Sequence, residues 1–476
     1  MAEPAALAGL PAALGFPAAA APPPLSLPRP GGLLHFVPPL ARPVVRRRAA
    51  RAFLPAAGPA PAPTGHVTVA GLLASPSGIG EGARLCAARL GELGYVVGGL
   101  DLAAPAGPLP ERRGAAPGGA LLVHLNPPGF QMALLRRLRA RLPGRRLIAY
   151  WAWEAPDLPR EWRAAFRLVH EIWVPSHFVA GALARAGCPV PVRVVPHPVR
   201  VPHPLAPADQ AARPAREELP AREELTVLTV LAFDSGFERK NPLAAIAAFR
   251  RAFGDRPGAR LVVKTRGRSA SGRPEAALRA AIAGSPAIRE IHGDLSAAAY
   301  AALLGQADVM LSLHRAEGFG IPLAEAMLLG KPVVATGWSG NLDFMSPATA
   351  CLVPARLVPV ADEAEAYRGL RSVWAEPAVE PAAAWLARLS DPALRARLGA
   401  AAAAHAAQVL GAAAFATAVR PALGAPPAPL DTLSPTMVPG MVPGMVPGMV
   451  PGMVPGAPPA PLVPAGPGAA VTPLAA

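Results

Sequence analysis

Lysine is scarce in this chain of 476 residues, which has only three lysines against 43 arginines. Cysteine is equally scarce. The three cysteines, Cys86, Cys188 and Cys351, show neither metal-ligand nor redox-motif spacing, which fits a reducing compartment. The pattern Asp-x-Asp does not occur, and none of the ten histidines pairs at ligand spacing with cysteine or a carboxylate. We therefore expect no bound metal.

Long apolar runs are also missing, although 52% of the residues are hydrophobic. No stretch of 18 or more apolar residues is free of proline and charge, so the sequence predicts no transmembrane helix. The first residues lack a basic leader and are broken by prolines, which argues against a secretory signal. We therefore expect a cytoplasmic protein.

The two ends of the chain are poor in patterns that build a core. Residues 1–64 are dominated by alanine and proline, and residues 424–476 contain the sequence MVPG five times. Proline at every fourth position interrupts helices and interior strands, so we predict two disordered tails. The remaining roughly 360 residues suffice for two domains of ordinary size.

Short apolar strands alternate with helical patterns in residues 65–200 and again in residues 226–423. Residues 201–225 are polar and rich in proline, and we interpret them as a linker. The alternation predicts an α/β protein with two Rossmann-like, doubly wound domains that face each other across a cleft. Strands are expected at residues 66–73, 95–102, 120–126, 146–153, 171–174, 192–195, 226–233, 261–264, 288–292, 308–313, 332–336 and 351–354. Helices are expected at residues 81–92, 129–142, 159–168, 177–186, 242–253, 275–283, 296–305, 322–329 and 391–408.

The segment EGFGIPLAE, from Glu317 to Glu325, carries the strongest chemical signal. Gly318 and Gly320 permit a tight turn after a predicted strand, and Pro322 suits the first position of a helix. A helix start offers unpaired N–H groups to a phosphate, and an ionised glutamate can accept paired hydrogen bonds from vicinal sugar hydroxyls. The segment therefore predicts a sugar-nucleotide site. The alternative is that one glutamate complements the helix dipole and the other is solvated.

The three lysines add to this signal. A compact ammonium group at a fitted phosphate site is not replaced by a guanidinium fork, even in a chain rich in arginine. We predict that Lys240 and Lys264 face a nucleotide diphosphate, whereas Lys331 precedes a strand and is expected in a surface turn.

The segment HRAEGFGIPLAEAM, residues 314–327, resembles the family-four retaining glycosyltransferases, which have the two-domain GT-B fold. Further similar segments follow the order that the family would show and span about residues 65–410. They are SPSGIGEGAR (75–84), YWAWEAPDLP (150–159), EIWVPSHFVA (171–180), VVPHPV (194–199), FERKNPLAAIAAFRRAF (237–253), LVVKTRG (261–267) and ATGWSGNLDFM (335–345).

The resemblance implies retaining, metal-independent transfer of a hexose from a nucleotide diphosphate sugar to a saccharide or lipid-linked saccharide, in cell-surface polysaccharide synthesis. It favours mannose or glucose, and no cofactor is expected besides the nucleotide sugar. Glu325 would hold the ribose hydroxyls, Glu317 would lie near the 3- and 4-hydroxyls of the sugar, and Lys240 would neutralise the diphosphate. The other donor-side candidates are Gly80, Glu81, Arg239, Lys264, His314, Gly318, Phe319, Gly320, Ile321, Ser339 and Asn341.

His124, at a predicted strand end, is the first-domain candidate for contacting the sugar or the acceptor; the alternative is a buried, fully paired histidine. The family is described as using the departing phosphate oxygen to take the proton of the acceptor, so we name no protein nucleophile. From the motif alone, Glu317→Ala is expected to abolish transfer with little loss of folding.

Two other functions stay open. A GT-B protein without catalytic activity could bind glycans or scaffold partners through its tails. The glycines Gly78, Gly80 and Gly82, with Asp101 about 20 residues on, also resemble a dinucleotide site, which would suit an NAD-dependent oxidoreductase. Their spacing is GxGxG rather than GxGxxG, however, and this function does not explain the segment from Glu317 to Glu325.

The net charge of +15 suits phosphate-bearing substrates, nucleic acid or an anionic membrane surface equally well. Residues 131–146 carry six arginines beside four leucines, as a basic amphipathic helix would. Such a helix could rest on anionic lipid at the inner face of the plasma membrane, near a lipid-linked acceptor; the alternative is a solvated helix face. We expect no nucleic-acid partner.

Overall fold

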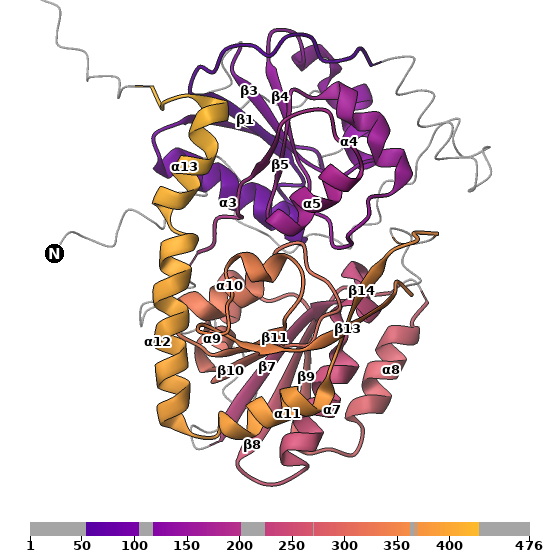
Figure 1. Cartoon of the computed structure of the whole chain (residues 1–476), viewed down its shortest axis with the longest axis vertical. Helices are drawn as coiled ribbons and strands as arrows, with labels where there is room; N and C mark the ends of the chain where they lie inside the picture. Colours follow the sequence, from indigo (N-terminus) through magenta and orange to yellow (C-terminus); the bar gives the residue numbers. More distant parts are fainter. Residues whose placement is uncertain are drawn as a thin grey trace, which may run out of the picture. The chain divides into compact units, whose positions relative to one another are not determined.

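The computed structural model describes residues 54–103, 118–200, 224–269, 271–361, 367 and 369–427. The MVPG repeats and most of the predicted linker lie outside these residues. The described part contains two six-stranded sheets, whose paired strands are all parallel, and one antiparallel pair of strands (Figure 1). The predicted α/β class with two Rossmann-like domains is confirmed.

The first sheet has the strand order β2-β1-β3-β4-β5-β6. Two of its inner strands, β3 and β5, are buried along their whole length, because helices cover both faces of a parallel sheet. The order reverses between β1 and β3, which places a crevice at the carboxyl ends of these two strands. The strands are β1 (His66–Gly71), β2 (Val96–Asp101), β3 (Ala120–His124), β4 (Arg146–Tyr150), β5 (Glu171–Val174) and β6 (Val192–Val194).

The second sheet has the order β12-β11-β10-β7-β8-β9, and its order reverses between β7 and β10. The carboxyl ends of β7 and β10 therefore open on one crevice, where open α/β sheets bind ligands. The strands are β7 (Leu225–Ala232), β8 (Ala259–Arg266), β9 (Ile288–His292), β10 (Val309–Ser312), β11 (Val333–Thr336) and β12 (Cys351–Val353).

The helices of the first domain begin with α3, which is capped by Ser77, whose Oγ accepts from the N–H of Gly80. The helix expected at residues 129–142 is instead three short pieces: α4, one turn of π-helix and one of 3-10 helix. Nothing in the structure explains this division. The helical elements are α3 (Gly78–Glu92), α4 (Gly129–Ala133), η3 (Leu134–Leu138), η4 (Arg139–Arg141), η5 (Arg160–Leu168) and α5 (His177–Arg185).

The second domain has all five helices that the sequence predicts, and further elements that it did not. The strands β13 (Ala355–Pro359) and β14 (Val373–Pro377) form the antiparallel pair. β13 was missed because its residues are mostly exposed and carry no buried apolar run. The helical elements are η8 (Phe233–Ser235), α6 (Phe237–Lys240), α7 (Pro242–Phe253), α8 (Arg273–Ile282), α9 (Ala297–Gln306), α10 (Ile321–Leu328), η9 (Gly340–Asp343), α11 (Val379–Arg388), α12 (Pro392–Val409) and α13 (Ala412–Leu423).

The predicted boundary of the N-terminal tail at residue 64 needs correction. From Leu54 onward the chain lies against the first domain, where the Leu54 side chain is 2% exposed and belongs to the core. The N–H of Ala57 donates to the carbonyl of Arg167 at 2.8 Å. A segment of alanine and proline can thus be fixed by one apolar anchor and a few backbone hydrogen bonds, which composition does not reveal.

The predicted C-terminal boundary of the second domain at residue 423 also needs correction. α12 buries Ala402 and Ala406 against the second sheet, but α13 buries Phe415 and Val419 in the core beside the first sheet (Figure 1). The two helices together, Pro392–Leu423, are long and apolar enough to cross a membrane by length and composition alone. Part of their apolar surface packs on two different protein cores, and 28% of the apolar window is buried.

Candidate functional site

A charged cluster lies where the order of the second sheet reverses. Glu317 follows β10, and Arg239 and Lys240 belong to α6, which follows β7. The ammonium of Lys240 is hydrogen-bonded to Glu317 Oε1, and Arg239 Nη1 lies 3.2 Å from Glu317 Oε2. The topology of the sheet therefore brings together three of the predicted site residues.

Glu317 is 8% exposed, yet it is ionised at neutral pH. Burial acts to raise the pKa of its carboxyl, but the ammonium of Lys240 and the guanidinium of Arg239 outweigh burial and lower the pKa to about 2. Burial lowers the pKa of Lys240, and the negative charge of Glu317 offsets this only in part. The cluster is a tightly coupled ion pair in low dielectric.

Arg239 and Lys240 differ in their hydrogen-bond partners and in their exposure to solvent. The guanidinium of Arg239 also donates to the carbonyls of Ser235, at 2.6 Å, and Ala316, at 2.9 Å, and the residue is only 3% exposed. The Lys240 side chain keeps 17% of its surface accessible. Arg239 thus fixes the loop that carries Glu317, and Lys240 is the cation of the pair that a ligand can reach.

The glycines around Glu317 are required by close backbone contacts. A Cβ on Gly318 would lie 2.9 Å from the carbonyl oxygen of Trp153, and one on Gly340 would lie 2.2 Å from the carbonyl oxygen of Gly318. Phe319, which follows Gly318 in the chain, is buried. The next residue, Gly320, has a φ of +100° and precedes α10. Ile321, half-buried, is the first residue of that helix.

Glu325 lies in the second turn of α10. The effect of a helix dipole fades within the first turn, so the dipole interpretation does not explain this residue. Its Oε2 accepts a hydrogen bond from the hydroxyl of Tyr300 at 3.1 Å. Burial raises the pKa of Glu325 to about 8; the bond from Tyr300 opposes this, and the charge of Glu81 in α3 adds to it.

Lys264 stands apart from this cluster. The residue is 4% exposed, and its ammonium donates to the carbonyl oxygens of Thr265, at 2.6 Å, and Gly293. Burial lowers its pKa to about 8. In this structure the Lys264 ammonium donates to backbone carbonyls. Its contact with a diphosphate stays a prediction.

His314, Ser339 and Asn341 form a buried hydrogen-bond network next to the loop that carries Glu317. His314 Nε2 lies 3.1 Å from Asn341 Oδ1, and the Oγ of Ser339 accepts from the N–H of Glu317 at 2.8 Å. Ser339 has a φ of +81°, a strained value for a residue with a side chain. The three residues thus hold the loop that carries Glu317.

On the first sheet, Gly80 and Glu81 lie in the first turn of α3. Glu81 is paired with Arg84, and Gly80 packs against the backbone of the β1 loop. Asp101 Oδ1 accepts from the N–H groups of Leu73, at 2.9 Å, and Ala103, at 3.0 Å. The acid that a dinucleotide site would use for ribose is therefore occupied in holding the β1 loop.

His124 ends β3 in a stack of aromatic rings. Its ring centroid lies 4.1 Å from that of Tyr150, which in turn lies 5.0 Å from that of His197. The ring centroid of His197 also lies 5.4 Å from that of Phe319, in the loop after Glu317, and the two rings meet edge to face. Among the described residues, His124 Nε2 and His197 Nδ1 have no hydrogen-bond partner, so His124 is not the fully paired core histidine of the alternative interpretation.

Sequence reasoning missed three first-domain residues that contact the second sheet's loops. Ser176 Oγ donates to the carbonyl of Gly318 at 2.7 Å, and the N–H of His177 donates to Asp343 Oδ2 at 2.8 Å. His197 is the third. All three lie in the quoted segments EIWVPSHFVA and VVPHPV, directly after strands β5 and β6, and their position at strand ends was the available signal.

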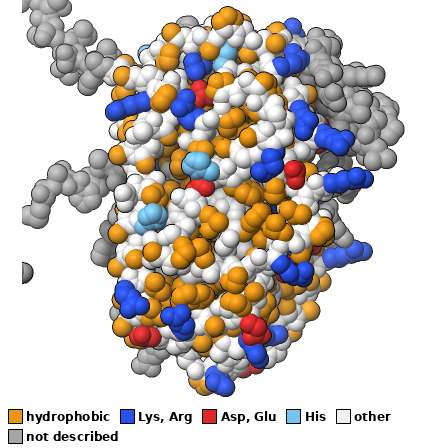
Figure 2. All heavy atoms as spheres, viewed as in Figure 1, with side chains coloured by type: hydrophobic (Ala, Val, Ile, Leu, Met, Phe, Trp, Pro, Cys, Tyr) orange, Lys and Arg blue, Asp and Glu red, His pale blue; other side chains and the backbone are white. Residues whose placement is uncertain are grey.

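The arginine-rich segment 131–146 does not present the predicted amphipathic face. Its leucines pack inward: Leu134 and Leu138 are in the core, and Leu135 and Leu142 lie against it. The guanidinium of Arg145 is buried and donates to Thr68. On the face that Figure 2 shows, Lys and Arg side chains are spread over the surface and do not gather in one patch.

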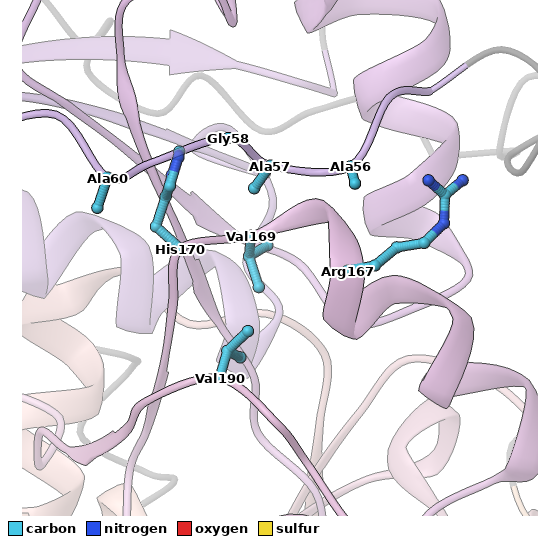
Figure 3. A pocket seen from close by; sticks show the side chains of 8 residues that line it. All are labelled: Ala56, Ala57, Gly58, Ala60, Arg167, Val169, His170 and Val190. Carbon is cyan, nitrogen blue, oxygen red and sulfur yellow. The ribbon is translucent and has the colours of Figure 1, made fainter.

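A shallow hollow lies elsewhere on the first domain (Figure 3). It is open and is lined by Ala56, Ala57, Gly58 and Ala60 of the N-terminal segment together with Arg167, Val169, His170 and Val190. None of these residues belongs to the charged cluster or to the ring stack. Within the described ranges, no three His, Cys, Asp or Glu side chains gather as metal ligands would.

Residues 225–374 match the family model described as glycosyl transferases group 1. No curated protein sequence matches the chain. The structure is similar to sucrose-phosphate synthase from Thermosynechococcus elongatus, with 17% identity and a TM-score of 0.53 over 74% of this chain and 96% of that one. A glycosyltransferase from Rickettsia africae gives 14% identity, a TM-score of 0.53 and coverage of 74% and 95%.

HepE from Anabaena, solved in complex with UDP, gives 15% identity, a TM-score of 0.52 and coverage of 75% of this chain and 99% of that one. These identities establish the fold alone. The family match falls on the sheet and loops that hold Glu317, Lys240 and Glu325. That match and the fold together support a group 1 glycosyltransferase with the GT-B architecture.

Proposed function

We propose that the protein is a retaining, metal-independent hexosyltransferase. It moves a hexose, with mannose or glucose favoured, from a nucleotide diphosphate sugar to a saccharide or lipid-linked saccharide in cell-surface polysaccharide synthesis. The observation that carries the proposal is the ion-paired cluster of Glu317, Lys240 and Arg239 at the switch point of the second sheet. A buried ammonium at such a crevice suits a diphosphate that gains negative charge as it leaves.

Each group of this cluster has a role that its surroundings support. Lys240 would exchange part of its interaction with Glu317 for the diphosphate. Glu317, kept ionised, would accept hydrogen bonds from two hydroxyls of the sugar. Glu325 would do the same for the ribose. Catalysis would rest on placing the acceptor within attack distance and on stabilising charge, with no protein nucleophile.

HepE is a structural neighbour that binds UDP, which makes uridine diphosphate sugars the first donors to test. We place the reaction in the cytoplasm, at the inner face of the plasma membrane if the acceptor is lipid-linked. Membrane contact would depend on exposed arginines such as Arg136 and Arg139, since the leucines of that segment pack inward. Flotation with anionic vesicles at low salt measures it, and a protein that stays at the bottom of the gradient contradicts it.

The experiment that tests the proposal is a panel of UDP-, GDP- and ADP-hexoses, assayed for release of the nucleoside diphosphate with and without saccharide acceptors. We expect one base to be used, and Lys240→Met to lose at least about a hundredfold in rate, as for loss of a charge-stabilising group. Lys331→Met is the matched control, because this lysine donates to the carbonyl of Gly305 at a distant surface turn and its loss leaves the rate unchanged.

An unaltered protein that binds a nucleotide sugar but neither hydrolyses nor transfers it would support the silent, glycan-binding alternative. A protein that binds none of the nucleotides would contradict the proposal altogether.

A further inference from the structure

Tyr300 is a residue that the motifs did not mark and that touches the predicted ribose-binding group. It lies in the first half of α9, on the helix that follows β9, whereas Glu325 lies on α10. Its hydroxyl donates to Glu325 Oε2 at 3.1 Å, and the ring packs against the same core cluster as Ile321 and Leu328. Two helices thus meet through one polar contact at the site.

We infer that Tyr300 is a positioning residue for nucleotide binding: it holds the Glu325 carboxylate so that the remaining lone pairs face the two ribose hydroxyls of the donor. The inference rests on the proposed function. It adds a residue from outside the glycine-rich loop to the donor site.

The geometry gives the physical reason. A glutamate has three rotatable bonds, and without a fixed partner it would sample several orientations, each of which costs entropy when a ligand selects one. A hydrogen bond from a ring anchored in a core removes this freedom before the ligand arrives. It occupies one lone pair of Oε2 and leaves the rest of the carboxylate for bidentate contact with vicinal hydroxyls.

The surrounding charges make this bond consequential. Burial disfavours the ionised form of Glu325, and the negative charge of Glu81 from α3 acts in the same direction. The bond from Tyr300 opposes both. A carboxylate that has lost this bond would be protonated more readily, and a protonated carboxyl accepts fewer hydrogen bonds.

The test compares a ribonucleotide with its 2′-deoxy counterpart. Calorimetry on the full chain first finds which of UDP, GDP and ADP binds. It then measures the dissociation constant of that diphosphate and of its 2′-deoxy form. In the unaltered protein at pH 9, above the Glu325 pKa of about 8, we expect the ribose form to bind about tenfold more tightly, since one charge-assisted hydrogen bond is worth about that factor.

Tyr300→Phe keeps the ring and removes only the hydroxyl. We expect the preference for ribose to fall to about two- to threefold, with the affinity for the deoxy form unchanged. Glu325→Gln should remove the preference. The matched control is Tyr95→Phe, which removes a hydroxyl that donates to the carbonyl of Gly424 at 2.8 Å in the first domain, and which should leave both affinities unchanged.

Two results would overturn the inference. If Tyr300→Phe keeps the full preference for ribose, the bond does not position Glu325, although the proposed function stands. If it weakens both nucleotides equally, Tyr300 is a structural residue of α9. A protein that binds none of the three diphosphates removes the proposed function, and the inference with it.

Discussion

The carboxyl ends of the two sheets differ in how they keep polar groups buried. At the second sheet Glu317 is ionised, because two cations from α6 overcome the effect of burial on its pKa. At the first sheet His124 and His197 are buried among rings and, because burial lowers the pKa of each, uncharged. One side of the site is a charged network and the other is a neutral stack.

The difference shows which kind of ligand group each side can take. A paired ion cluster can exchange one of its partners for a phosphate without creating an isolated charge, since it already holds charges of both signs. Neutral imidazoles offer one donor and one acceptor each and suit groups without charge, such as hydroxyls. The predictions below break one side at a time, beginning with the largest effect.

Glu317→Gln should have the largest effect, on both activity and folding. Activity should fall at least about a hundredfold, since the group is placed against the sugar. The variant also leaves two buried cations without a countercharge, which costs about 3–5 kcal/mol of unfolding free energy. The expectation from the motif alone, that folding would barely change, is therefore revised. Urea unfolding and the transfer assay measure the two effects.

Glu380→Gln is the matched control for stability. Glu380 pairs with Arg251 at 2.9 Å, but both side chains are about two-thirds exposed. A solvated ion pair contributes about 0–1 kcal/mol, so this variant should unfold almost like the unaltered protein. Equal stability losses in the two variants would show that burial of the Glu317 cluster is not what makes it costly to break.

Acidification should lower the free energy of unfolding through the buried, neutral His197. Burial lowers the pKa of His197 from 6.5 to about 4, so between these values the unfolded chain takes up a proton that the folded protein does not. The contribution of neutral His197 is fully present above pH 6.5 and is lost as the pH falls to about 4, by roughly 1 kcal/mol per pH unit.

The variant His197→Phe removes this titration while keeping an aromatic ring in the stack. Its unfolding free energy, measured in urea at pH 7, 5.5 and 4, should vary less with pH than that of the unaltered protein. Glu317 contributes in a lower window, from pH 4.5 down to about 2, so it does not obscure the comparison. Parallel curves for the two proteins would contradict a neutral, buried His197.

Donor binding should strengthen as the pH rises, because Glu325 must ionise before it can accept two hydroxyls. Its pKa of about 8 leaves about a tenth of the group ionised at pH 7. KM for the donor should therefore fall by up to about tenfold between pH 7 and pH 9. Glu325→Gln has no such group, so the ratio of its KM to that of the unaltered protein should rise across this range, whatever Lys264 contributes to both; a constant ratio would show that Glu325 does not titrate there.

Much of the charged side could be predicted from the sequence. The strand before Glu317, the glycines and the position of Lys240 follow from local patterns whose period and turn residues are visible in the chain. Sheet topology then brings two loops together at a switch point. The sequence could not show that Arg239 also donates to two backbone carbonyls, because side-chain contacts depend on the tertiary structure.

The neutral side was harder to predict. His197 stacks with Tyr150 although 47 residues separate them, and its ring fits only because Gly82 has no Cβ, which would lie 2.7 Å from Cε1. The order β4-β5-β6 brings these strand ends near one another, but no motif marks the stack. The helix α13 was not predicted, and neither was its packing on the first sheet: a helix pattern would show which face is apolar, and not which sheet it covers.

The smallest effect is expected where the two sides touch. Ser176 caps α5 by accepting from the N–H of Val179, and its Oγ donates to the carbonyl of Gly318 next to Glu317. Ser176→Ala should cost about 1–3 kcal/mol of stability, from the lost cap and the unpaired carbonyl, and lower kcat/KM a few fold.

The matched control is Asp391→Ala, which removes the cap of α12, where Asp391 accepts from the N–H of Ala393 at 2.9 Å. It should cost about 1 kcal/mol and leave kcat/KM unchanged. If both variants keep full activity, the contact between Ser176 and the Glu317 loop only stabilises the fold. If only Ser176→Ala loses activity, the contact from the first domain positions the loop that carries Glu317. The variant removes no charge and no group from the donor site, so the loss could not arise there directly.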